Sequence, residues 1–280
     1  MTSISVAFRH TSEWAAITCL LGSQAFASNS MESLVQVPDG INLVGGVIGR
    51  VPEFWGANHN ANGLAPMLRK QLDGDRYLQL LGTELTYNML DHPHWRAGPS
   101  LGVRLGRDDV TDTVVRRMQP IDGTGEVGVF VSYTDPLGTD PRHRWGFNLA
   151  VAGAPSNVYS GIYGSASVHW LKPVLPWLTA SASAGVGIGT AGFQSTYFGV
   201  SSEDNHLFPR LAGRSYELGG GLTDVRLLLG GLVHLSQSWH VVVGARWQRL
   251  VSGAADSPLV RERGNATQWM LGSGLVYTWR

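Results

Sequence analysis

Residues 269–280, WMLGSGLVYTWR, carry the clearest structural pattern in the sequence. Mostly apolar and aromatic side chains fall on one face of an extended chain: Trp269, Leu271, Ser273, Leu275, Tyr277 and Trp279. The other face carries Met270, Gly272, Gly274, Val276, Thr278 and Arg280. A strand rises about 3.3 Å per residue, so this segment, tilted by about 45°, crosses an apolar layer about 25 Å tall. An aromatic ring then lies at each border of the layer, and the pattern predicts a membrane-spanning β-strand.

The composition fits a barrel of such strands. Charged residues make up 15% of the 280 residues, and 36 residues are Gly. Soluble domains average about a quarter charged residues. No run of 18 apolar residues follows the N-terminal segment, which argues against helical membrane spans. The 21 basic and 21 acidic residues balance and the arginines are scattered, so we expect no nucleic-acid partner.

Residues 1–27 are typical of a secretory signal peptide. Arg9 and His10 precede an apolar run over residues 14–21, and small residues at Ala25 and Ala27 suit signal peptidase. We expect cleavage after Ala27, so that residues 28–280 form the mature barrel. The single cysteine, Cys19, would leave with the signal, and the mature chain would then have no disulfide.

Alternation between apolar and polar residues recurs from about residue 40 to the end of the chain. Eleven segments show it: 41–50, 63–72, 76–90, 95–106, 123–134, 143–152, 158–171, 176–189, 221–236, 238–251 and 267–279. Single-chain bacterial barrels have an even number of strands. The alternation breaks around Gly82, because Leu78 and Leu80 share a parity that Leu85 and Tyr87 do not. A turn at Gly82 gives twelve strands; ten strands with a peripheral hairpin is the alternative.

The twelve-strand arrangement also sorts the connections. It places the long loops 51–62, 107–122, 190–220 and 253–266 at one end, the end that faces outward in such barrels. Short turns are expected at 73–75, 91–94, 171–173 and 236–238. The longest loop, 190–220, contains Arg210 and Arg214; it either folds into the barrel mouth or lies free on the surface. No helical periodicity is sustained anywhere in the sequence.

Few residues suggest catalysis. His169, His240, Ser165 and Ser167 have the parity of lumen-facing side chains, but no nucleophile-elbow spacing surrounds the serines. Asp256-Ser257-Pro258 is more typical of a turn. We therefore expect no catalytic residue and no enzyme activity.

Metal and cofactor signals are also weak. His92 and His94 flank Pro93 with one nearby carboxylate, Asp91, whereas zinc needs three or four ligands in a fixed frame. The run Gly185-Val186-Gly187-Ile188-Gly189 resembles half of a nucleotide-binding fingerprint, but no helix is predicted after it. We expect no metal, no cofactor and no cofactor-binding residue.

A narrow pore is the alternative to a binding scaffold. The expected inward residues Arg96, Arg104, Arg246 and Gln248 either line a polar path or pair with acids such as Glu84 and Glu126 and seal it. Twelve strands enclose a lumen that side chains nearly fill, whereas 16 to 18 strands leave an aqueous channel.

The connecting segments resemble the outer-membrane family of the MltA-interacting protein and OmpV. The resemblance is most specific in the last third, at QSTYFGVS (194–201), GGLTDV (220–225) and GAADSPLV (253–260). It is looser at PEFWG (52–56), GPSL (98–101), GRD (106–108) and IDG (121–123). Together these segments extend the resemblance over most of residues 40–280.

The resemblance implies a role rather than a chemistry. Members of this family are described as scaffolds of the bacterial outer membrane that bring a murein lytic transglycosylase together with a bifunctional murein synthase. We therefore expect outer-membrane lipid and these two enzymes as partners. The loop 202–214, with Glu203, Asp204, Asn205 and His206, is individual to this chain.

Overall fold

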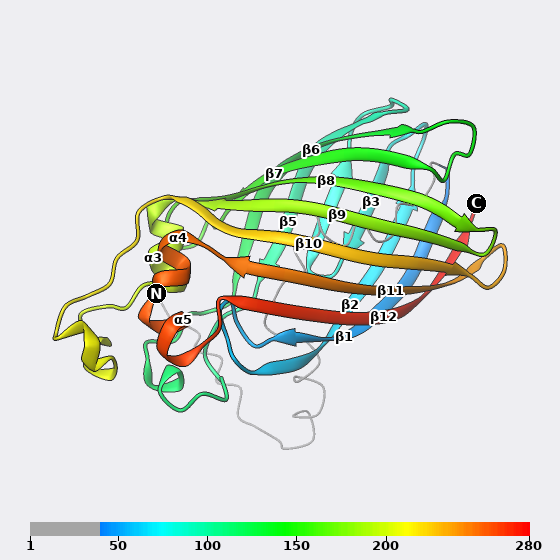
Figure 1. Ribbon diagram of the computed structural model, residues 1–280. Helices are drawn as coiled ribbons and strands as arrows, with labels where there is room; N and C mark the ends of the chain where they lie inside the picture. The colour runs from blue at the N-terminus through cyan, green and yellow to red at the C-terminus, as the bar shows by residue number, and fades with distance from the viewer. Residues whose placement is uncertain (1–39) are drawn as a thin grey trace, which may run out of the picture.

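The computed structural model describes residues 40–280, and the predicted signal peptide 1–27 lies outside them. Twelve strands form one closed antiparallel barrel in which every strand pairs with its neighbours in the chain (Figure 1). The strands are β1(Asn42–Pro52), β2(Asn60–Gln71), β3(Tyr77–Leu81), β4(Glu84–Asn88), β5(Trp95–Arg104), β6(Thr124–Pro136), β7(Arg144–Gly153), β8(Ile162–Leu175), β9(Leu178–Gly189), β10(Gly221–His234), β11(Trp239–Leu250) and β12(Thr267–Trp279). The predicted fold class and strand number are confirmed.

The final strand has the two faces that its sequence predicts. Trp269, Leu271 and Leu275 are exposed on the outer surface, whereas Met270 and Val276 are buried inside. β12 closes the barrel by pairing with β1, from Asn42 opposite Trp279 to Arg50 opposite Leu271. Closure leaves neither of these strands with an open edge, which a bilayer would not tolerate.

The turn at Gly82 decides between twelve and ten strands. β3 and β4 are joined by Gly82 and Thr83, and Gly82 has a φ of +62°, a conformation that favours glycine. The hairpin is part of the wall, between β2 and β5. Its two strands have five residues each, and β3 pairs with β2 only over Met67–Gln71. Pro66, which lacks an N–H, lies where this ladder ends, and its carbonyl accepts a hydrogen bond from the Gly82 N–H at 2.8 Å.

Three of the four predicted turns are confirmed, and one is wrong. The chain turns between β2 and β3, between β4 and β5, and between β10 and β11, as expected. At 171–173 it does not turn: β8 continues to Leu175, with a register shift between Pro173 and Leu175, and the turn is Pro176-Trp177. The bulge there lets a proline remain inside a strand.

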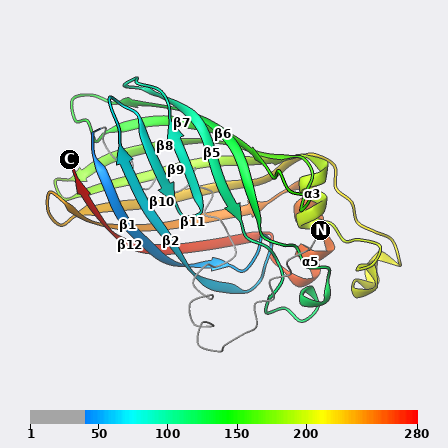
Figure 2. The same ribbon diagram turned by 180° about the vertical axis from the view of Figure 1, so that it is seen from behind.

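Short helices at one end of the barrel were not expected from the sequence. They are α3(Ala191–Phe198), α4(Ser252–Asp256) and α5(Pro258–Arg263), with the 3-10 turns η1(Val115–Arg117), η2(Asn205–Leu207) and η3(Pro209–Leu211). With eight residues or fewer, none is long enough to produce a sustained 3.6-residue period. Figure 2 shows them at the end opposite the C-terminus, which we call the long-loop end; the other is the turn end.

The expectation that no helix follows the glycine run 185–189 is also wrong, since α3 begins at Ala191. The glycines themselves lie within β9 rather than in a loop before the helix. A Cβ added at Gly187 would lie 2.0 Å from the Tyr163 hydroxyl, and one added at Gly189 would lie 2.8 Å from Phe193. These glycines therefore allow close packing in the lumen.

The barrel interior contains one apolar cluster among many buried polar side chains. An apolar cluster joins inward residues of β1, β2, β3, β10, β11 and β12: Leu43, Val47, Ala65, Met67, Leu81, Leu228, Val242 and Val276. Polar side chains from β5 to β9 are buried elsewhere in the interior, among them Arg96, Ser132, Asn148, His169 and Ser181. Among residues 40–280, no helix is both long enough and apolar enough to span a bilayer.

Candidate functional site

The long-loop end is closed by a cluster of aromatic rings. Trp55, from the loop after β1, stacks on Phe198 of α3 with centroids 6.0 Å apart and meets Tyr163 of β8 edge-on at 5.3 Å. Phe193 lies 5.0 Å from Tyr163 and, like Phe198, is fully buried. The first part of loop 190–220 therefore folds into the mouth, which is one of the two alternatives that the sequence left open for this loop. We call these four residues, together with Tyr197, the plug: Trp55, Tyr163, Phe193, Tyr197 and Phe198.

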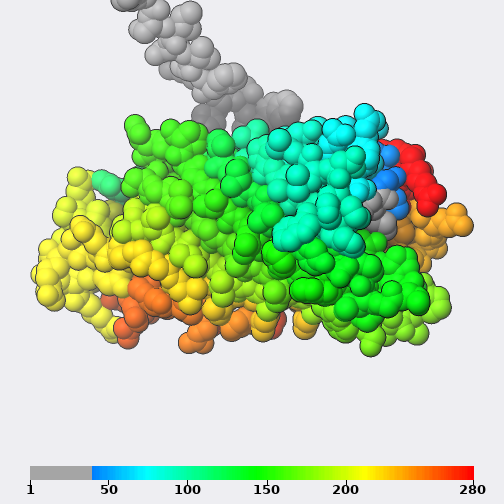
Figure 3. Space-filling model, turned by 90° about the horizontal axis from the view of Figure 1, so that it is seen from above, coloured from blue at the N-terminus to red at the C-terminus, as the bar shows by residue number. Residues whose placement is uncertain are grey.

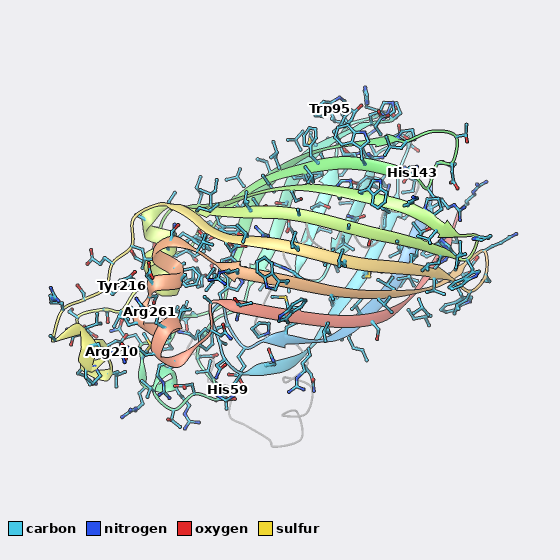
Figure 4. The ribbon with its side chains drawn as sticks, viewed as in Figure 1. His59, Trp95, His143, Arg210, Tyr216 and Arg261 are labelled. Atoms are coloured by element: carbon cyan, nitrogen blue, oxygen red, sulfur yellow. The ribbon has the colours of Figure 1, made fainter. Side chains whose placement is uncertain are left out.

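The second part of the same loop extends away from the barrel. Figure 3 shows this yellow segment at one end of the molecule, and Arg210 lies at its tip in Figure 4. Arg210 and Arg214 are exposed. The other interpretation, a surface loop, therefore holds for residues around 209–214.

Arg104 lies beneath the plug, paired with Glu126. Arg104 Nε donates to Glu126 Oε1 at 2.7 Å, and Nη2 donates to Oε2 at 3.2 Å. The guanidinium carbon is 5.0 Å from the Phe193 ring centroid and 5.2 Å from that of Trp55. Of the two alternatives that the sequence left open for Arg104, a polar path or pairing with an acid, the structure shows pairing with Glu126. The aromatic faces further stabilise the cation.

Two tyrosines of the loops complete this network. The Tyr159 hydroxyl donates to Glu126 Oε1. Burial, and then this hydrogen bond, raise the pKa of Tyr159 above its ordinary value. Burial also raises the pKa of Tyr197 to about 12. Both hydroxyls therefore remain protonated at neutral pH, and neither supplies a base.

A second buried ion pair lies near the long-loop end of β10. Arg226 Nε is 2.8 Å from Asp224 Oδ1, and Asp224 is fully buried. The Tyr163 hydroxyl donates to Asp224 Oδ2 at 2.9 Å and accepts from Arg226 Nη2 at 2.7 Å. The Asp224 carboxylate is thus held by the Arg226 guanidinium and the Tyr163 hydroxyl, and we interpret this cluster as structural rather than catalytic.

Arg246 lacks such an acid. It is 2% exposed, its Nη2 donates to Gln248 Oε1 at 3.0 Å, and its Nε and Nη1 have no hydrogen-bond partner within residues 40–280. It shares a cavity of about 10 Å³ with Ser165, Ser167 and Ser183. This is space for about one water molecule. The predicted inward positions of Arg246, Gln248 and the two serines are confirmed.

The two histidines are also inward but lie on separate parts of the wall. His169 is buried in β8. His240 contacts His234, with their Nδ1 atoms 3.0 Å apart, and its Nε2 is 3.1 Å from the Thr278 hydroxyl. These contacts link β10, β11 and β12 near the turn end.

The remaining sequence candidates have structural positions. Ser257 joins α4 to α5, is fully buried, and donates its hydroxyl to the Phe198 carbonyl at 2.5 Å. His92 Nδ1 accepts from the backbone N–H groups of His94 and Trp95, both at 3.1 Å. Residues 40–280 contain no group of three or more His, Cys, Asp or Glu side chains able to hold a metal.

A pocket of about 630 Å³ opens among the long loops. Its lining includes Arg107, Asp122, Asp204 and Glu217. Burial lowers the pKa of Arg107 to about 10. Asp204 accepts a hydrogen bond from the Gln119 N–H at 3.1 Å, so loop 202–214 is linked to loop 107–122. Sequence reasoning missed the pocket, because it forms between segments that are far apart in the chain.

The turn end presents smaller polar features. Arg142 pairs with Asp140 at 2.9 Å and donates to the Pro176 carbonyl at 3.1 Å. The Trp170 indole donates to His143 Nε2 at 3.2 Å, and Trp177 is about half exposed. Figure 4 shows His143 and Trp95 at this end. The turns thus form a rim of aromatic and charged side chains.

These features define a class: a twelve-stranded β-barrel of the outer-membrane type, with an apolar outer surface and a mouth closed by its own loops. Among solved structures, the chain is similar to the NanC porin, with a TM-score of 0.47 and 7% identity over 84% of this chain and 98% of that one. It is also similar to the COG4313 outer membrane channel from Pseudomonas putida F1, with a TM-score of 0.47 and 11% identity over 87% and 97% of the two chains. Such likenesses carry no statement about function.

The particular family follows from the sequence itself. The family model described as MltA-interacting protein MipA matches residues 44–279, and the chain belongs to this family. The expected resemblance is thereby confirmed. A comparison with curated proteins gave no match.

Proposed function

We propose that the protein is a non-catalytic scaffold of the bacterial outer membrane that holds a murein lytic transglycosylase close to a bifunctional murein synthase. The observation that carries this proposal is the family match over residues 44–279. The described interior adds support, since its two strongest acid–base clusters are ion pairs closed by tyrosine hydroxyls.

The proposal includes an orientation. Barrels of this type have long loops outside and short turns in the periplasm. The turn end then faces the murein layer, and the rim at Arg142, His143 and Trp177 becomes the surface available to a murein enzyme. Exposed tryptophan and arginine are the side chains that most often anchor protein interfaces.

Retention of a purified lytic transglycosylase by the detergent-solubilised barrel tests the scaffold role. We expect a variant with Arg142→Gln and Trp177→Ala to retain the enzyme at least about tenfold more weakly, the loss typical of an interface anchor. The matched control is Arg210→Gln with Arg214→Gln at the other end, which should retain it fully. No retention by the unmodified barrel contradicts the scaffold role; weakening by the control pair alone contradicts the orientation.

A narrow channel is the second candidate, and Arg246 favours it. A buried inward cation with two unbonded guanidinium nitrogens, Nε and Nη1, offers hydrogen-bond donors to an anion in the lumen. Single-channel recording in a planar bilayer separates the candidates. Steady openings support the channel, and silence across many insertions supports the scaffold.

We also propose that residues 1–27 are removed after Ala27 as a signal peptide. N-terminal sequencing of the mature protein tests this: any other first residue than Ser28 contradicts the assigned cleavage site.

A further inference from the structure

Five neighbouring strands place inward-facing glycines at paired positions, and a groove lies on the outer side of this row. Paired residues run across the wall in the order Gly63, Gly49, Gly272, Gly244 and Gly230, from β2 through β1, β12 and β11 to β10. All five have the parity of inward-facing residues. A Cβ at Gly49 would lie 2.4 Å from the Leu271 carbonyl oxygen, so glycine is needed there for close backbone approach.

On the outer side of this glycine row lies a hollow of about 940 Å³. Its rim is exposed and mostly apolar, with Ile48, Leu229, Val243 and Leu271 beside the polar Asn62. The small side chains of Ala245 and Ser273 also line it. A surface of this shape, facing the hydrocarbon of a bilayer, matches an acyl chain.

The end of the groove nearer the long loops has a different chemistry. Trp247 of β11 lies opposite Trp269 of β12, and Trp269 is exposed on the outer surface. Tryptophan is enriched at the boundary between hydrocarbon and headgroups. Each tryptophan lies two residues beyond a residue that lines the groove, Ala245 or Leu271, so the long-loop border of the groove is close to an interfacial level.

Two arginines flank this tryptophan pair. Arg50 lies opposite Leu271, and Arg249 lies opposite Thr267; both are exposed on the outer face. Neither forms a hydrogen bond or ion pair with the described residues. An arginine facing lipid is costly unless it reaches the interface, where its planar group suits phosphate.

We propose that this groove binds one phosphate-bearing lipid of the leaflet on the long-loop side, with an acyl chain over the glycine row and the phosphate between Arg50 and Arg249. Charge complementarity at the groove's end is what commits the occupant to an anionic lipid rather than to a second barrel. The inference rests on the membrane location in the proposed function and not on the scaffold role.

Native mass spectrometry of the detergent-solubilised barrel with added dimyristoyl phosphatidic acid tests the proposal. We expect Arg50→Gln with Arg249→Gln to weaken retention of this lipid at least about tenfold, as for loss of charge-assisted contacts. The matched control replaces outward lysines near the turn end, Lys70→Gln with Lys172→Gln, and should retain the lipid as the unmodified barrel does. Filling the groove with Ala245→Leu and Ser273→Leu should weaken retention without touching either arginine.

Other outcomes overturn the proposal. Equal weakening by the lysine pair would mean nonspecific attraction of anionic lipid. Displacement of the lipid by inorganic phosphate alone would mean an anion site without a lipid groove. A dimer that the groove-filling variant abolishes would make a second copy the occupant. Heat-modifiable migration on gels shows that each variant is folded, and unchanged retention of a murein enzyme separates loss of lipid from failure of the scaffold role.

Discussion

Arg104 of β5 and Glu126 of β6 form a two-pronged ion pair directly beneath the rings that close the barrel mouth. Their side chains are 14% and 10% exposed, and the Tyr159 hydroxyl donates to the same carboxylate. The pair ties the wall to the loops, because Arg104 also lies over the ring of Phe193 in α3.

Replacing Glu126 with Gln should destabilise the folded barrel. Removing one partner of a buried pair leaves the other charge uncompensated, which costs roughly 3 kcal/mol. Urea unfolding in detergent, followed by tryptophan fluorescence, measures the change. The control is Asp140→Asn, which breaks the partly exposed pair with Arg142 and should lower the stability far less, because water screens that pair. Equal effects of the two substitutions would show that the mouth pair is not buried in solution.

Acid should loosen the long loops through Asp112. Burial would raise the pKa of Asp112, but hydrogen bonds from Arg263 and from the N–H groups of Val115 and Val114 outweigh burial and hold the pKa below 3.8. Because the folded-state pKa is depressed, the stabilisation is present above pH 3.8 and is lost as the pH falls through the folded-state value. Proteolysis of the loops by pepsin measures it. The loops of the Asp112→Asn variant should be cut faster at pH 5, and their rate of cleavage should change less as the pH falls. A rate of cleavage with the same acid dependence as in the unmodified protein argues against a role for the Asp112–Arg263 pair.

Replacing Phe193 with Ala should open the mouth. The ring is fully buried against Tyr163 and Trp55, and truncating a buried Phe costs roughly 3–5 kcal/mol. We expect a lower unfolding midpoint and faster proteolysis of loop 190–220. The control is Leu235→Ala, an exposed side chain in a turn at the other end. If Phe193→Ala behaves like this control, the rings do not close the mouth.

Two glycines of β1 should respond differently to an added methyl group. Gly49→Ala places its Cβ 2.4 Å from the Leu271 carbonyl, whereas Gly46→Ala finds its first neighbour at 3.8 Å. Overpacking costs roughly 1–3 kcal/mol, so Gly49→Ala should reduce the heat-modifiable fraction and Gly46→Ala should not. The same gel measures both, and a reversed order would contradict the register between β1 and β12.

Period-two alternation was sufficient to predict the barrel. In β12, Trp269 and Trp279 are exposed on the outer surface and Met270 is buried inside, so the alternation along one strand is enough to indicate which face is which. The break in parity near Gly82 predicted the added turn for the same reason. The helix α3 was not predicted because its eight residues are too few to show a helical period. The turn predicted at 171–173 was wrong because Pro173 lies at a bulge within β8 rather than in a turn.

The alternating pattern alone indicates which side chains face inward, including Arg104, Glu126 and Arg246. The tertiary structure decided which of them are paired: Arg104 meets Glu126 across two strands, whereas Arg246 finds Gln248 on its own strand. It also decided that Gly49, Gly272 and Gly244 lie side by side. Parity is a local property of one strand, but partners depend on the register between strands, which the closure of the whole barrel sets.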